Sequence, residues 1–106
     1  MNDRELLERA AEAAEYGEVM FCPTSRTGGF YCIEEYEGGP LKEWNPLTND
    51  GDALRLAVMV CLPLDIGDDF TAIHPLGIIE QHGVDAYAAT RRAIVRAAAE
   101  IGNRQQ

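Results

Sequence analysis

Residues 44–58 constrain the fold most, because they join a rigid aromatic loop to the start of a helix. Pro46 biases Asn45 towards an extended backbone, and either Asn49 or Asp50 can cap the helix that follows. The segment contains no recognisable set of catalytic groups. We therefore expect it to build the fold rather than to hold a substrate.

The helix predicted from this cap, over residues 50–61, is apolar almost all round from residue 53 on, and Arg55 is its lone charge there. A helix of this composition is buried on more than one side. Two placements would satisfy that requirement, one at the centre of the fold and one in a contact between subunits. Because the helix also ends in apolar residues, Met59 is a candidate contact residue.

Two further helices are predicted at the ends of the chain. Asn2 and Glu5 have the form of a capping box, and the helix that follows should end by Gly17. Its apolar residues recur at helical spacing, namely Leu6, Leu7, Ala10, Ala11 and Ala14. The last helix is predicted over residues 85–101, with Gly102 as its C-terminal cap. One face of it should pack, carrying Tyr87, Ile94, Ala97, Ala98 and Ile101.

Short apolar runs between the helices read as strands. A turn-rich loop over residues 23–29 joins the first two, and residues 38–43 should form a loop leading to Trp44, since paired glycines and a proline end the second strand. The predicted strands cover residues 19–22, 30–33, 64–66, 70–74 and 78–81. The sequence thus predicts one α+β domain over residues 1–106, with three helices packed on a mainly antiparallel sheet of four or five strands.

Three segments resemble the small phage and prophage proteins of the phage ABA sandwich domain family. They are residues 44–58, residues 88–102 and the Leu-Leu/Ala-rich N-terminal helix, and together they cover roughly half of the chain. The spacing from Trp-Asn-Pro to Asp-Ala-x-Arg-Leu-Ala is fairly specific. The resemblance implies layers of helix, sheet and helix and a phage or prophage origin, and it supplies no catalytic residues.

Composition and charge exclude several classes of protein. The chain is 46% hydrophobic and 25% charged, which is ordinary for a globular domain, and no stretch approaches the roughly 20 apolar residues of a membrane span. The three cysteines form an odd set without C-x-x-C spacing, which favours reduced thiols and a cytoplasmic location, and the resemblance implies that the cell is a bacterial host. A net charge of −9 disfavours direct binding to nucleic acid.

Metal sites and catalytic groups find little support in the spacing. Residues 49–52 offer clustered oxygens for calcium, but the acidic first and last positions of such a loop are missing, and helix capping explains the acids. Two cysteines and two histidines match no zinc module, namely Cys22, Cys32, His74 and His82. A Cys–His catalytic pair would need a shared site that spacing cannot show, and His82 is expected instead to be either a surface histidine at the start of the last helix or a core histidine. We expect no metal, no cofactor and no catalysis.

The candidate interaction residues are Trp44, Met59, Arg91 and Arg92. Trp44 is either a packed plug over the helix start or an exposed anchor for a partner. Arg91 and Arg92, with Arg96, form either a basic strip for an acidic partner or a solvated helix face.

The function expected from the sequence is that of a small phage or prophage accessory protein. It would act by contact with an unidentified protein partner, and it would form a homodimer through the helix at residues 50–61. The alternative is an acidic inhibitor that mimics DNA and occupies a host or competing nucleic-acid-binding protein. That role needs rows of carboxylates, which only the N-terminal helix approaches.

Overall fold

The computed structural model describes residues 2–23, 29–34, 36 and 38–104, and within them it confirms an α+β chain with three helices. In chain order the elements are α1 (Asp3–Ala13), β1 (Met20–Cys22), β2 (Phe30–Glu34), β3 (Leu41–Glu43), α2 (Asp50–Met59), β4 (Leu64–Ile66), β5 (Phe70–Ile73), β6 (Ile78–Gln81) and α3 (Ala86–Arg104). The loop predicted over residues 23–29 falls mostly outside the described residues.

The strands of the described residues form two separate antiparallel sheets of three strands each, in the orders β1-β2-β3 and β4-β5-β6. The sequence predicted a single sheet of four or five strands instead. Each strand pairs with a neighbour in the chain, and α2 separates the two groups. Strand β3 lies where a loop was predicted, because its three residues are all exposed and show no alternation of apolar and polar side chains. The predicted strand at residues 78–81 is confirmed as β6.

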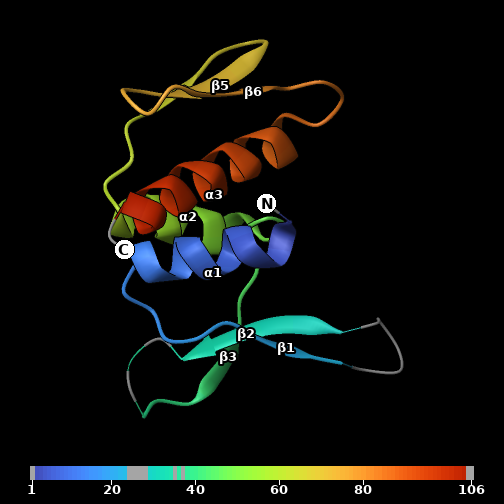
Figure 1. Cartoon of the computed structure of the whole chain (residues 1–106). Helices are drawn as coiled ribbons and strands as arrows, with labels where there is room; N and C mark the ends of the chain where they lie inside the picture. The colour runs from blue at the N-terminus through green and yellow to red at the C-terminus, as the bar shows by residue number, and fades with distance from the viewer. Residues whose placement is uncertain (1, 24–28, 35, 37, 105–106) are drawn as a thin grey trace.

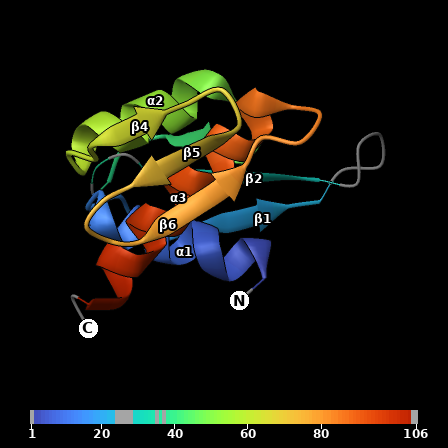
Figure 2. The ribbon, with the colours of Figure 1, turned by 90° about the horizontal axis from the view of Figure 1, so that it is seen from above.

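The helices lie between the two sheets, with β5 and β6 on one side and β1 to β3 on the other (Figure 1). Seen from above, β5 and β6 cross over α3, and β4 is the strand of that sheet nearest to α2 (Figure 2). The layers therefore run sheet, helix, sheet, whereas the resemblance implied helix, sheet, helix.

Helix α3 is central because small residues let it pack on two sides. Ala93 and Ala97 contact Ile73 of β5 in a small second core. On its other side α3 joins the main core with α1, α2 and β2 through Ile94, Val95, Ala98 and Ala99. Alanine adds little thickness to a helix, so neighbouring elements can approach both faces closely.

Gly102 permits the closest approach of α1 and α3. A Cβ atom at this position would lie 2.0 Å from the backbone oxygen of Arg9, well inside van der Waals contact. The prediction that Gly102 caps the helix is wrong, because α3 continues to Arg104. This glycine is needed for packing between helices rather than for a turn.

Helices α1 and α2 end in the same motif, and neither uses glycine for it. The residue after the cap is left-handed in both, Glu15 with φ of 62° and Cys61 with φ of 57°. The next N–H, of Tyr16 or Leu62, returns to a carbonyl of the last helical turn. This is the hydrogen-bond pattern of a Schellman motif, in which glycine is the usual left-handed residue.

Candidate functional site

Trp44 is part of the main core and only 3% exposed. Its ring and the ring of Tyr16 form a T-shaped contact with a centroid distance of 5.8 Å, and its backbone N–H donates to the carbonyl of Tyr31. Of the two interpretations of Trp44, the packed plug describes the structure. The exposed anchor does not, since the indole is not accessible to a partner.

The loop after Trp44 is held by side-chain hydrogen bonds at the start of α2. The Asn49 side chain accepts from the N–H of Asp52, so Asn49, rather than Asp50, is the cap. The buried carboxylate of Asp52 in turn accepts from the N–H of Asn45 and from Arg55. These polar groups thus satisfy one another. Among the described residues, no group of three or more His, Cys, Asp or Glu side chains is placed to hold a metal ion.

The arginines of α3 connect this helix to three other parts of the chain. Arg91 donates to the carbonyl of Leu47 (2.9 Å) and to Asp50 (2.6 Å). Arg92 pairs with Asp3 on α1, and Arg96 pairs with Glu80 on β6. Because each guanidinium has an acidic partner within the chain, Arg91 and Arg92 do not present an unpaired basic strip.

Helix α2 leaves one face open to solvent. Leu54 is 61% exposed, Val58 68% and Met59 55%, while Ala53, Leu56 and Ala57 are buried on the opposite side. The central placement predicted for this helix is therefore wrong. The contact between subunits, which was the other placement, stays a prediction. We call Leu54, Val58 and Met59 the α2 ridge.

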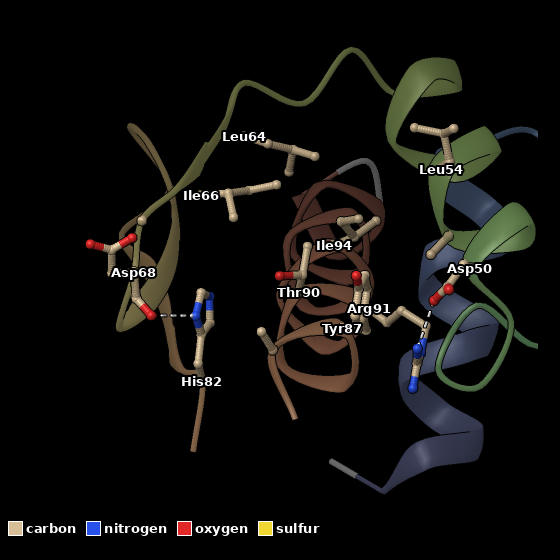
Figure 3. Close-up of a pocket in the computed structure, with 13 residues that line it drawn as sticks. Asp50, Leu54, Leu64, Ile66, Asp68, His82, Tyr87, Thr90, Arg91 and Ile94 are labelled. Carbon is tan, nitrogen blue, oxygen red and sulfur yellow. Dashed lines mark hydrogen bonds and ion pairs between the residues drawn. The ribbon is translucent and has the colours of Figure 1, made fainter. Parts of the chain in front are cut away.

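A cavity of about 640 Å³ opens beside this ridge, between α2, the β4–β5 region and the start of α3 (Figure 3). Its walls are mostly apolar: Leu64 and Ile66 lie on one side, Leu54 on the other, and Ile94 between them. Tyr87, predicted on the packed face of α3, is instead 73% exposed and lines the cavity. Apolar concave surfaces of this size are typical of binding sites. We call this cavity the apolar groove.

A chain of polar side chains lies at the groove. His82 Nε2 is 2.8 Å from the hydroxyl of Thr71, and that hydroxyl is 2.7 Å from the hydroxyl of Thr90. The other ring nitrogen, Nδ1, is 3.1 Å from the carbonyl oxygen of Asp68. A carbonyl can only accept, so Nδ1 carries a proton and, in the neutral ring, Nε2 accepts from Thr71.

These bonds define the role of His82. Of the surface and core placements predicted for His82, the core placement describes the structure, since His82 is buried and both ring nitrogens are bonded within the chain. No cysteine lines the groove beside it. The geometry therefore gives His82 a part in fixing β5 and β6 to α3, and the Thr71 hydroxyl to which it bonds is completely buried.

Sequence reasoning missed the groove because its walls come from segments far apart in the chain. Leu54, Ile66 and Tyr87 are brought together only by folding. The one signal present in the sequence was the apolar character of α2 on every side, which indicated that its outer face meets something besides its own core.

No protein-family model matches the chain, and neither a curated protein nor a solved structure is significantly similar to it. The resemblance to the phage ABA sandwich domain family therefore rests on the three sequence segments alone and stays a prediction. In the part of the chain that the structure describes, no helix combines the length and the apolar character needed to cross a membrane.

Proposed function

We propose that this chain is a small accessory protein of a phage or prophage that acts by protein contact, without catalysis and without a cofactor. The observation that supports this is the apolar groove together with the exposed α2 ridge beside it. Contiguous apolar surface of this kind is unusual on a monomer and marks interaction sites. Burying one exposed leucine or isoleucine contributes about 1.5–3 kcal/mol.

The partner that we propose for this surface is a second copy of the chain. The ridge and the groove are adjacent on one face, so a two-fold axis beside α2 would place each ridge against the groove of the other copy. Such a self-complementary arrangement is the usual form of a homodimer. A net charge of −9 opposes association, so added salt should strengthen this dimer by screening the repulsion.

Sedimentation equilibrium over a range of concentrations tests the homodimer. We expect the mass of the wild type to rise towards that of a dimer, and Leu54→Asp to weaken association at least about tenfold, because it would bury an unpaired charge. Leu41→Asp is the matched control, since Leu41 is 54% exposed but lies on β3 in the other sheet. It should leave association unchanged.

Two results would contradict parts of this proposal. A wild type that stays monomeric at the highest concentration excludes the second copy as partner. Capture from lysogenic cells, with wild type, Leu54→Asp and Leu41→Asp as baits, then tests the surface itself. Partners retained equally by all three baits would show that the ridge and groove are not the contact surface.

The acidic inhibitor that mimics DNA is not favoured by a comparable observation. On α1, Glu8 pairs with Arg4 and Glu12 pairs with Arg9. Mimicry of a phosphate backbone depends on rows of carboxylates that are free to meet a basic partner. Salt separates the two ideas, because a complex of that kind would weaken with added salt while the proposed dimer would strengthen.

A further inference from the structure

Two cysteines of the β1–β3 sheet lie with their sulfur atoms almost in contact. The Sγ atoms of Cys22 and Cys32 are 2.9 Å apart. The strand register pairs Cys22 with Phe30 and Cys32 with Met20, so the two thiols are diagonal neighbours on one face of the sheet. All three cysteines of the chain are free, and Cys61 lies elsewhere, exposed after α2.

We propose that Cys22 and Cys32 are a site of reversible disulfide formation that locks β1 to β2. A disulfide bond requires a sulfur separation of about 2.05 Å. The two Sγ atoms, which are 2.9 Å apart, therefore need to approach each other by less than about 1 Å. Side-chain rotation supplies a movement of that size, and the strand register can stay as it is. The paired backbone already holds both residues on the same face.

The two thiols differ in accessibility, which sets the order of the steps. Cys22 is partly exposed and Cys32 is buried. The hydrogen bond with Cys22, together with burial, raises the pKa of the Cys32 thiol to about 11. Since the thiolate is the nucleophile in disulfide exchange, Cys22 is the residue that meets an outside oxidant first.

The co-reactant that we propose is a low-molecular-weight disulfide, of which oxidised glutathione is the usual laboratory example. The Cys22 thiolate attacks one sulfur of glutathione disulfide and releases one glutathione thiolate, which takes up the proton lost by Cys22. The Cys32 sulfur then attacks Cys22 Sγ in the mixed disulfide, loses its proton and releases the second glutathione. Two protein thiols are oxidised, and one glutathione disulfide is reduced to two thiols.

The sequence analysis favoured reduced thiols on the grounds of cysteine number and compartment, and this proposal is compatible with that resting state. In a reducing environment the pair stays as two thiols, hydrogen-bonded across the strands. When the surrounding thiol–disulfide balance becomes oxidising, the same pair closes. The disulfide closes a loop between the two cysteines and so lowers the conformational entropy of the unfolded chain. The folded sheet is therefore stabilised relative to the unfolded chain.

The test uses the Cys61→Gly variant, in which Cys22 and Cys32 are the remaining thiols. The protein is incubated with excess oxidised glutathione, treated with an alkylating agent and weighed intact. We expect a product lighter than the reduced protein by two hydrogen atoms, with no alkyl group and no glutathione. Trypsin cleaves after Arg26, between the two cysteines, so two peptides joined by a reducible bond should identify the link.

Single variants in the same background distinguish two cysteines that form a disulfide with each other from two thiols that react independently. Cys32→Ser should accumulate one glutathione on Cys22, because the resolving thiol is gone. Cys22→Ser should stay unmodified, because Cys32 is buried. Two alkyl groups on the parent, or a stable glutathione adduct on the parent equal to that on Cys32→Ser, would overturn the proposal. A disulfide between two chains would also overturn it, and its doubled mass would identify it.

The thermal midpoint supplies a second readout. The oxidised parent should unfold several degrees above its reduced form, and the difference should be absent from both single variants. An oxidised parent that unfolds at the same temperature as the reduced one would contradict the stabilising role given to the bond.

Discussion

The two sides of α3 differ in how completely they are filled. Towards α1 the helices are in direct contact, with Gly102 against the backbone of Arg9. Towards β4 and α2 the chain leaves the apolar groove, and Leu54, Ile66 and Tyr87 stay largely exposed around it. Small residues close the first side, whereas large apolar residues line the open one. The closed side therefore supports the fold, and the open side is the surface available for binding.

The largest effect is expected from filling the closed side at Gly102. Gly→Ala in the interior of a helix normally stabilises it by up to about 1 kcal/mol. Here the added Cβ would overlap the Arg9 carbonyl, which is rigid backbone, so we expect Gly102→Ala to destabilise the protein by about 5 kcal/mol, more than a typical overpacked site costs. Urea denaturation followed by circular dichroism measures it.

The exposed neighbour Asn103 provides the control for this change. Asn103→Ala lies in the same helical turn and should be neutral or slightly stabilising. A Gly102→Ala variant as stable as Asn103→Ala would show that the two helices are further apart than the structure has them.

The next effect compares the two cores directly. Leu56 and Ile73 are both completely buried, the first in the main core and the second in the small core under β5. Truncation to alanine should cost about 4 kcal/mol at Leu56 and about 2 kcal/mol at Ile73, because fewer buried neighbours surround the second site. The same urea experiment compares them, and an equal or reversed order would contradict the difference between the two cores.

A smaller effect is expected at the polar chain beside the groove. Thr71→Val leaves Nε2 of His82 without its hydroxyl partner in a buried position, which should cost about 1–3 kcal/mol. Thr90→Val should cost less, since the bond between Thr71 and His82 survives it. Thermal unfolding of both variants decides the order. Equal losses would mean that Thr71 does not act as the link between His82 and Thr90.

Local signals were enough to predict where the helices begin. Asn2 caps α1 as its sequence pattern indicated, Asn49 is the one of two candidates that caps α2, and the side chain of Asp85 accepts from Ala88 at the start of α3. A cap depends on residues within one helical turn of each other, so a short stretch of sequence is enough to predict it. The number of helices and most of the strands followed from the same short-range patterns.

The arrangement of the elements could not be predicted in the same way. Whether two hairpins join one sheet or form two depends on contacts between residues far apart in the chain, and both groups of strands have the same local pattern. Gly102 illustrates the ambiguity, because a glycine near a helix end suits a cap as well as a close helix contact. The apolar groove was invisible for the same reason, since four separate segments line it.

The smallest effect concerns the C-terminal ends of α1 and α2. It tests whether a left-handed residue costs the same stability on the closed side as on the open side. Glu15 ends α1 on the closed side, and Cys61 ends α2 beside the open one, each in the left-handed region that glycine adopts without strain. We expect Glu15→Gly and Cys61→Gly each to stabilise the protein by about 0.5–1 kcal/mol, with similar gains at both sites. Alanine at either position keeps the backbone strain, so Glu15→Ala and Cys61→Ala are the controls and should yield no gain. If only Glu15→Gly stabilised the protein, the end of α2 would be held by contacts besides its own hydrogen bonds. The two sides of α3 would then differ in their helix ends as well as in their packing.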